Sequence, residues 1–447
     1  MKGIARFGVL VGLFIVPALT AQGGQPGNGF AQVNLVANSA DYNPQIVDPN
    51  MIDAWGIALR PPGAGGHIWV NNAESGTSDE FIGDVAGMPL HQDGLTSVPL
   101  DTPHFTDHGY AFTTGIAYNS ASDLAGQPVE FFVSGPANNF GTTPPTPISG
   151  GTSGAAKFVF CTEDGCINAW RANTAAGMLS APVMIDYSKT STFPYAANCV
   201  FSGCTLTNNA GDSAAYLAQG GNHLFAVDFR NNAIEVFDNQ WKDVTASYHF
   251  ATPATVKDLH VFNILDLGGH LFVTYAEFDD AGDEGMEEVD GPGLGHLVEY
   301  NEDGTLVRDF KDCGMLNAPW GVAIAPAGYG KFGGDVLVGN FGDGTIAAFD
   351  PATGKFIDNL RDPDGEVISI DGLWGLVFGN GVSLGDANTL YFTAGPNGEF
   401  DGLFGKLMIP EPPATDTPAM PPLALALLGV LLAAVAGPRL TVAVRQT

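Results

Sequence analysis

The chain has 447 residues, of which 45% are hydrophobic and 15% charged, so it is too apolar for a disordered protein and long enough for a large core. It holds 17 Lys and Arg against 48 Asp and Glu, and the resulting net charge of −31 excludes nucleic-acid binding because it repels a phosphate backbone. The 59 Gly and 30 Pro follow no three-residue period, which excludes collagen and predicts many turns.

Residues 1–21 are typical of a secretory signal peptide. Lys2 and Arg6 form a positive start, the stretch from Phe7 to Leu19 is apolar, and cleavage is expected after Ala21. The alternative is an uncleaved membrane anchor, although the apolar stretch is shorter than the roughly 20 residues that a spanning helix needs.

Residues 22–409 show no long helical period, and short runs of Val, Ile, Phe and Tyr alternate with Gly, Asn and Asp turns. One unit recurs, in which a segment such as Trp55-Gly56, Trp320-Gly321 or Trp374-Gly375 is followed by a loop and a second strand. A weaker copy begins at Thr114-Gly115. The unit predicts a four-stranded antiparallel sheet that repeats at intervals of about 55–65 residues.

The repeat predicts an all-β fold, a six-bladed β-propeller. The six blades are expected near residues 30–85, 110–170, 180–240, 258–310, 318–360 and 370–409. Each Gly would let neighbouring inner strands approach closely, and each Trp would fill the gap between two blades. Seven blades or an array of two-sheet sandwiches are the alternatives.

The cysteines predict two disulfides, in keeping with an exported protein. Cys161 and Cys166 flank an expected hairpin turn, and Cys199 and Cys204 repeat the same spacing. Zinc is the rival, but the pattern C-x2-C is absent. Cys313 is left over and is expected to be a buried thiol.

Two segments could bind a metal ion. The acidic stretch 278–291 contains the calcium candidates Asp279, Asp280, Asp283, Glu284 and Glu287, because Ca²⁺ prefers oxygen ligands on a flexible loop. A solvated loop is the alternative. His104, Asp107 and His108 are a weaker group, since the two histidines would share a face only on a helix and Pro103 favours a loop.

The C-terminal end predicts a membrane anchor. Residues 410–420 form a Pro-rich spacer, and residues 421–437 are uncharged and apolar around their whole circumference, which is typical of a spanning helix. Arg439 and Arg445 place the short tail 438–447 in the cytoplasm by the positive-inside rule. A buried core helix is the alternative.

Several segments resemble an uncharacterised family of exported bacterial proteins with a propeller-like domain. The resemblance covers nearly the whole body in order, and it lies in Gly29–Ala58, Thr114–Asn119, Lys157–Trp170, Asp290–Phe310, Asn317–Pro326, Val336–Asp350 and Asp371–Gly381. Members often carry a PEP-CTERM sorting tail, and Pro410, Glu411 and Pro412 match its motif. The resemblance implies processing by an exosortase-like enzyme, and it brings no catalytic residues.

The sequence therefore predicts a binding or scaffolding module at the cell surface, whose partner would be a component of the cell envelope or of the extracellular matrix. The alternative is a calcium-dependent hydrolase or lyase of the lactonase kind, with its site in the central channel. By analogy of fold, polar residues near the ends of inner strands would then hold the ion. These residues are Asn71, Asn72, Glu74, Asn119, Asp228 and Asn340. No other cofactor is expected.

Overall fold

The computed structural model describes residues 29–103, 109–123, 129–139, 146–173, 176–188, 199–207, 221–279 and 287–410. Two compact units are separated at Pro410, and the second unit, 411–447, lies wholly outside the described residues. The expected signal peptide at 1–21 and the expected anchor helix at 421–437 also lie outside them. In the part of the chain that is described, no helix has the length and apolarity needed to cross a bilayer.

Regular structure in the described residues is almost entirely β-strand, as the strand-and-turn pattern predicts. Only short 3-10 helices interrupt the strands, namely η1 (Ala40–Tyr42), η2 (Ala73–Ser75), η3 (Ser120–Asp123), η5 (Thr245–Ser247), η6 (Ala254–Val256) and η7 (Gly330–Phe332).

Six antiparallel sheets make up most of the unit that ends at Pro410. In the order of their first strands, they are β3 (Ala54–Ala58), β4 (Ile68–Asn72), β5 (Thr77–Phe81) and β6 (Ser97–Pro99); β7 (Thr113–Tyr118), β12 (Phe158–Thr162), β13 (Cys166–Trp170) and β15 (Val183–Asp186); β16 (Phe201–Leu206), β17 (Leu224–Asp228) and β18 (Ala233–Phe237); β19 (His260–Asp266), β20 (His270–Asp279), β22 (Gly295–Asn301) and β23 (Leu306–Asp309), with β21 (Glu287–Val289) also beside β20; β24 (Pro319–Ile324), β25 (Val336–Asn340), β26 (Ile346–Phe349) and β27 (Phe356–Asn359); and β28 (Leu373–Phe378), β29 (Leu390–Ala394) and β30 (Leu403–Met408).

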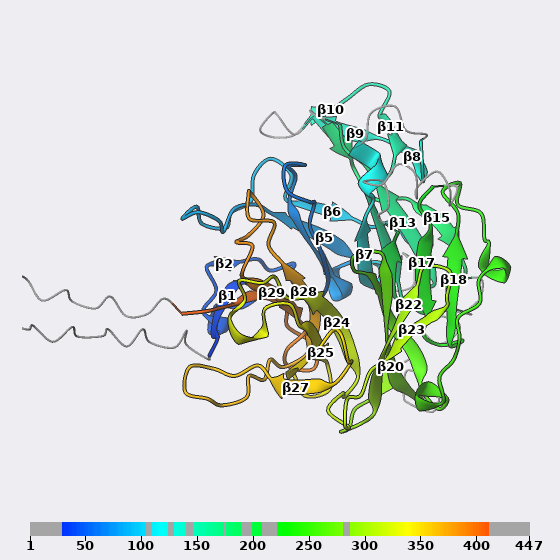
Figure 1. Cartoon of the computed structure of the whole chain (residues 1–447). Coiled ribbons are helices and arrows are strands. Elements are labelled where there is room, and N and C mark those ends of the chain that lie inside the picture. The colour runs from blue at the N-terminus through cyan, green and yellow to red at the C-terminus, as the bar shows by residue number, and fades with distance from the viewer. Residues whose placement is uncertain are drawn as a thin grey trace, which may run out of the picture. The chain divides into compact units, whose positions relative to one another are not determined.

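Two strands from the start of the described chain complete the last of these sheets. β1 (Ala31–Ala37) pairs antiparallel with β30, and β2 (Ile46–Val47) pairs parallel with β1. The sheet thus has the order β2-β1-β30-β29-β28, and Figure 1 shows the blue β1 on the same side of the molecule as β29 and β28. The expected first blade, 30–85, is therefore wrong at its N-terminal end, because residues 31–47 belong to the sheet of β28.

The first strands of consecutive sheets contact each other in a closed circle, in which β28 also touches β3. Glycine allows this close approach. A methyl group at Gly56 would lie 2.3 Å from the Thr114 carbonyl oxygen, and one at Gly321 would lie 2.4 Å from the Trp374 carbonyl oxygen. The prediction that the Trp-Gly and Thr-Gly segments form inner strands in close contact is confirmed, and the chain has a β-propeller fold.

Two smaller sheets are formed by strands that lie in the chain between the members of the β7 sheet. One has the order β10 (Thr146–Pro147), β9 (Ala137–Asn139) and β14 (Ala176–Met178), and the other pairs β11 (Thr152–Ala155) with β8 (Phe132–Gly135). Strands β8 to β11 lie between β7 and β12, and β14 lies between β13 and β15. The fourth strand of the β7 sheet, β15, follows them and lies beyond the predicted limit at residue 170.

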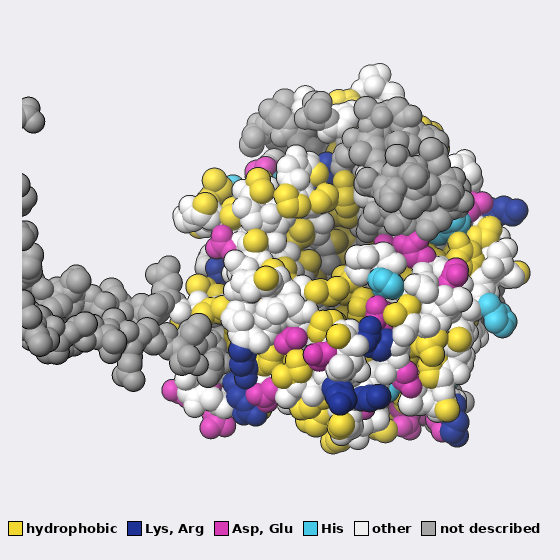
Figure 2. Space-filling model, in the orientation of Figure 1, with side chains coloured by type: hydrophobic (Ala, Val, Ile, Leu, Met, Phe, Trp, Pro, Cys, Tyr) yellow, Lys and Arg dark blue, Asp and Glu magenta, His cyan; other side chains and the backbone are white. Residues whose placement is uncertain are grey.

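Apolar clusters fill the space between neighbouring sheets. On the face shown in Figure 2, acidic side chains are spread over the surface and do not form one patch.

Candidate functional site

Three tryptophans lie together where the first strands of different sheets meet. Trp55 stacks on Trp374 with ring centroids 4.0 Å apart, and Trp320 lies edge-on at 6.3 Å from the first and 5.9 Å from the second. All three are at most 5% exposed. The expectation that each Trp fills a gap between two blades is therefore wrong, because the three indoles form one cluster. We call it the indole cluster.

The indole N–H groups of this cluster have different partners. Trp320 donates to the Ser202 carbonyl at 3.0 Å, and Trp374 donates to Oδ1 of Asp53 at 3.0 Å. The buried Nε1 of Trp55 has no partner in the described chain. A buried donor without an acceptor is costly, so a polar atom from outside this set of residues would stabilise it.

Five carboxyl groups lie at the same end of the sheets, next to the indole cluster. We call Asp53, Glu74, Glu163, Glu288 and Glu399 the central carboxyl cluster. Asp53 directly precedes β3. Glu74, Glu163 and Glu399 follow the second strands β4, β12 and β29, and Glu288 lies in β21, beside the end of β20. In an antiparallel sheet the start of the first strand and the end of the second lie at one edge, which explains why distant residues meet here.

These carboxyl groups interact through their charges. Burial, and after it the charges of Glu287, Glu74 and Asp290, raise the pKa of Glu399 from its ordinary 4.5 to about 7. The pKa of Asp53 lies well above its ordinary value because of burial and then the charge of Glu399. Asp53 is buried and the other four residues are partly buried, and the raised pKa values mean that the cluster favours a proton or another positive charge.

Burial also raises the pKa of Glu163 and of Glu288 well above the ordinary value, and in both the charge of Glu399 is the next cause. The groups that interact therefore come from separate sheets, which makes the cluster a property of the fold and not of one loop.

Asp53 and Glu399 form the tightest part of the central carboxyl cluster. Trp374 hydrogen-bonds both, and a methyl group at Gly395 would lie 2.2 Å from Oδ1 of Asp53 and 3.1 Å from Cγ of Glu399. Both acidic residues have positive φ, 47° and 67°, a conformation that side chains other than glycine rarely adopt. The backbone thus holds two carboxyl groups around one indole N–H.

Some of the residues predicted from the sequence belong to this site. Glu74 is a member of the central carboxyl cluster, and the charge of Glu287 helps to raise the pKa of Glu399. Asp279 ends β20 and pairs in the ladder with Glu287. Asp280, Asp283 and Glu284 lie outside the described residues, as do His104, Asp107 and His108. Within the described ranges, no three His, Cys, Asp or Glu side chains are grouped so that they could hold a metal ion.

The other predicted polar residues serve the strands and turns. Asn71 donates to the Thr114 and Gly115 carbonyls, Asn72 to Asp79, Asn119 to the Ala156 carbonyl and Asn340 to the Met315 carbonyl, and Asp228 accepts from Asn231. Glu288 lies in the acidic stretch 278–291 that the sequence singles out, although it was not among the calcium candidates, whereas Asp53, Glu163 and Glu399 were missed by the sequence reasoning. Asp53 could have been found, because it stands two residues before a recognised Trp-Gly segment.

The cysteines are arranged differently from the prediction. All five are free thiols in the structure, and Cys161 pairs in the ladder with Ile167, so the preceding Cys166 points to the opposite face of the sheet. The Cys161 thiol hydrogen-bonds Cys204 in the neighbouring sheet. Cys313, expected to be buried, is exposed.

Cys199 lies on the side of Cys166. A methyl group at Gly165, the residue before Cys166, would lie 2.7 Å from the Cys199 carbonyl oxygen. The Cys161 thiol therefore lies against Cys204, and Cys199, which precedes β16, interacts with Cys166.

Comparison with known proteins finds relatives that are themselves uncharacterized. Two proteins of Acanthamoeba polyphaga mimivirus are 28% and 26% identical to this chain, each over 84% of it and over 80% and 85% of their own length. A third is 32% identical over 38% of this chain and 33% of its own length. These relatives are viral, so the expectation of an exported bacterial family with a PEP-CTERM tail is wrong. The predicted sorting motif has no support, and of its residues only Pro410 is described.

No family model matches the chain. Similar solved structures include the WD40 β-propeller domain of Doa1 (TM-score 0.38, 11% identity, 79% of this chain and 93% of that chain), a streptogramin B lyase (0.35, 12%, 85% and 97%) and a putative oxidoreductase (glucose dehydrogenase) of Thermus thermophilus (0.41, 11%, 85% and 100%). Likeness at this level carries no activity over to the chain. The propeller assignment depends on the sheet order and the contacts between first strands.

Proposed function

We propose that the chain is a six-bladed β-propeller that works as an extracytoplasmic binding module, and that its central carboxyl cluster binds an organic ammonium group. The observation that carries the proposal is the set of carboxyl groups from separate sheets that raise one another's pKa beside the indole cluster. An ammonium group supplies positive charge and three hydrogen-bond donors, which are what such a cluster lacks.

The whole-chain charge supports the same ligand class. A net charge of −31 attracts cations over a distance and raises their rate of encounter. A bound ammonium would replace the protons that the carboxyl groups hold near neutral pH, so binding would release protons. The affinity would therefore rise between pH 6 and pH 8.

Isothermal titration calorimetry with 1,5-diaminopentane tests the proposal, and 1,5-pentanediol is the neutral control of the same length. We expect saturable binding of the diamine alone, tighter at pH 8 than at pH 6. Glu163→Gln should weaken it at least tenfold, whereas Asp364→Asn, at an exposed position, should leave it unchanged. Equal binding of the diol, or no effect of Glu163→Gln, would contradict the proposal.

The extracytoplasmic location is also a proposal. It is supported by the pattern of residues 1–21, with an anchor at 421–437 after the spacer 410–420 and a cytoplasmic tail at 438–447. Cell fractionation tests it. Deletion of residues 1–21 should retain the protein in the cytoplasm, and deletion of residues 410–447 should release it into the medium. A truncated body that stays with the membrane would show that the tail is not the anchor.

A calcium-dependent hydrolase or lyase is the second candidate. The observation in its favour is the pair Asp53 and Glu399 around one indole N–H, since a carboxyl group with a pKa of about 7 suits general acid–base catalysis. Lactone hydrolysis, measured with Ca²⁺ and with a chelator, tests this candidate. Activity that needs Ca²⁺ and is lost in Glu399→Gln would favour the enzyme over the binding module.

A further inference from the structure

The central carboxyl cluster occupies one side of the end of the propeller. Glu74, Glu163 and Glu399 follow the second strands of three sheets, those that begin with β3, β7 and β28. These sheets are neighbours in the circle of first strands, because β28 touches β3 and β3 touches β7. A run of consecutive sheets therefore supplies most of the carboxyl groups.

Phenylalanines stand at the corresponding positions of the remaining sheets. Phe229 follows β17, Phe278 lies near the end of β20, and Phe341 follows β25. The first strands of these sheets, β16, β19 and β24, are also neighbours in the circle. The end of the propeller thus has an acidic side and an aromatic side. We call Phe229, Phe278 and Phe341 the aromatic side.

Two of these phenylalanines present ring surface to a ligand. Phe229 is only 1% exposed, whereas Phe278 and Phe341 are half-buried. Phe341 stacks on Trp374 with ring centroids 4.0 Å apart, and Phe278 stacks on His260 at 4.7 Å. These contacts hold the two rings in place, and the parts that remain exposed are apolar surface that suits another ring.

The aromatic side lies close to the carboxyl groups. Phe278 pairs in the ladder with Glu288, a member of the central carboxyl cluster. Trp374 has the ring of Phe341 on its face and donates its N–H to Asp53. A ligand that touches either exposed ring is therefore within a short chain length of a carboxyl group.

One buried polar atom between the two sides has no partner. Trp55 is 5% exposed and stacks on Trp374, and its Nε1 finds no acceptor among the described residues. A buried donor without an acceptor destabilises the fold, so an acceptor from outside these residues would stabilise it. An oxygen atom of a ligand would supply that acceptor.

We propose that the site binds an aromatic amine, whose ammonium group lies among the carboxyl groups while its ring packs against Phe278 and Phe341. The inference rests on the proposed function and names the ligand class of the same site. An amine without a ring would leave the aromatic side in water, and a neutral aromatic molecule would bring no charge to the carboxyl groups. A bare Ca²⁺ ion fits less well, because phenylalanine supplies none of the oxygen ligands that it prefers.

Isothermal titration calorimetry at pH 8 tests the proposal. The probe is 2-amino-1-phenylethanol, which has the ring, the ammonium group and a hydroxyl oxygen. Its controls are 2-aminoethanol, which lacks the ring, and 1-phenylethane-1,2-diol, which lacks the ammonium group. We expect saturable binding of the probe, at least tenfold weaker binding of 2-aminoethanol and no saturable binding of the diol.

The outcomes separate this inference from the proposed function. If 2-aminoethanol binds as tightly as the probe, the ammonium site stands and the role of the aromatic side is overturned. Equal binding of the diol would also overturn it. If no amine binds, 1,5-diaminopentane included, the proposed function is contradicted and this inference with it.

Substitution on the aromatic side gives a second test. Phe278→Leu should lower the affinity for 2-amino-1-phenylethanol, relative to that for 1,5-diaminopentane, at least threefold, because it removes one aromatic contact. Phe341→Leu is a second variant in case the first does not fold. Phe356→Leu is the matched control, because Phe356 is also half-buried but lies in the outer strand β27. An unchanged ratio in both Phe278→Leu and Phe341→Leu would overturn the proposal.

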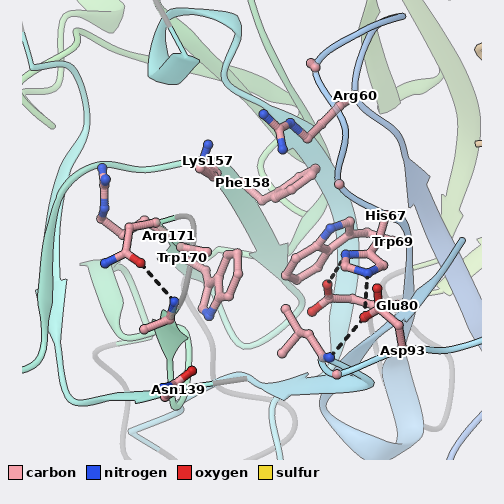
Figure 3. Close-up of a pocket in the computed structure, with 17 residues that line it drawn as sticks. Arg60, His67, Trp69, Glu80, Asp93, Asn139, Lys157, Phe158, Trp170 and Arg171 are labelled. Carbon is pink, nitrogen blue, oxygen red and sulfur yellow. Dashed lines mark hydrogen bonds and ion pairs between the residues drawn. The ribbon is translucent and has the colours of Figure 1, made fainter. Parts of the chain in front are cut away.

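A separate cleft provides the control for binding elsewhere on the chain. It measures about 820 Å³ and lies between the sheet of β3–β6 and the sheet that contains β7, β12, β13 and β15 (Figure 3). There His67 lies between Glu80 and Asp93, 3.0 Å from an oxygen of each, so these carboxyl groups already have a partner. Asp93→Asn should leave the affinity for 2-amino-1-phenylethanol unchanged. Weaker binding in Asp93→Asn, together with normal binding in Glu163→Gln, would assign the amine to the cleft and overturn the proposal.

Discussion

At the scale of single residues, the glycines of the first strands decide how closely the sheets approach. A methyl group at Gly115 would lie 2.5 Å from the Cys204 nitrogen and 2.9 Å from the Gly203 Cα, both of them backbone atoms that cannot turn aside. At Gly135 in β8, a methyl group would meet only the flexible end of Met178. The same substitution therefore has different consequences at these two positions.

We predict that Gly115→Ala lowers the free energy of unfolding by about 1–3 kcal/mol, because overpacking forces the neighbouring strand to move. Gly135→Ala should change it by less than about 0.5 kcal/mol, the range of changes away from packed contacts. Urea denaturation followed by tryptophan fluorescence measures both. Equal stability of the two variants would show that the first strands are not in close contact.

The cysteines give a second prediction at this scale. If the protein is oxidised with glutathione disulfide, we expect a bond between Cys161 and Cys204, since their thiols already touch, and none between Cys161 and Cys166, which point to opposite faces. Mass spectrometry of proteolytic peptides under non-reducing conditions measures the pairing. A peptide that links Cys161 to Cys166 would restore the prediction from sequence spacing and contradict the one from the structure.

The sequence spacing and the structure group these cysteines differently for a physical reason. Cys161 and Cys166 are close along the chain, but a strand alternates its side chains between two faces, and the partner comes from another sheet. The central carboxyl cluster was not predicted from the sequence, because its members also come from distant parts of the chain. Asp53 and Glu399 are 346 residues apart, so no local pattern could show that they share the N–H of Trp374.

At the scale of strands, the sequence pattern predicted several individual strands, but it did not predict which strand completes the last sheet. Trp-Gly and Thr-Gly segments start four of the first strands, and the Glu163-Asp164-Gly165 turn joins β12 to β13, both as predicted. The pairing of β1 with β30 could not be predicted, because a short apolar strand does not identify its partner. The expected first blade failed for this reason.

This pairing predicts that β1 is needed for folding although it comes from the far end of the body. Leu35 in β1 is fully buried, whereas Gln32 in the same strand is exposed. We expect Leu35→Ala to lower the free energy of unfolding by about 2–5 kcal/mol and Gln32→Ala to leave it nearly unchanged. Thermal unfolding of both variants measures this. A harmless Leu35→Ala would show that β1 does not close the last sheet.

At the scale of the whole molecule, buried carboxyl groups make stability depend on pH. Burial raises the pKa of Glu80 and that of Glu399 from the ordinary 4.5 to about 7. Between these values the folded chain keeps protons that the unfolded chain has lost, so stability falls as the pH rises from about 4.5 to about 7. Burial alone would lower the pKa of His67, but Glu80 and Asp93 raise it, and this acts in the same direction.

Other carboxyl groups determine at which low pH the folded chain begins to lose stability. Hydrogen bonds from Asn38 and Tyr42 lower the pKa of Asp401 below its ordinary value of 3.8, so the stability that it contributes is lost only in stronger acid. The two effects together place the greatest stability near pH 4, between the ordinary pKa of Asp401 and that of the buried glutamates.

We therefore predict that the urea midpoint rises steadily when the pH is lowered from 8 to 5. Glu399→Gln should make this dependence shallower, because Gln carries no titrating proton, whereas Asp401→Asn should keep the slope and lower the stability throughout. The midpoints of the three proteins at four pH values measure this. A wild-type midpoint that is constant or falls between pH 8 and pH 5 would mean that these carboxyl groups are ionised in the folded protein, and the basis for an ammonium site would then be lost.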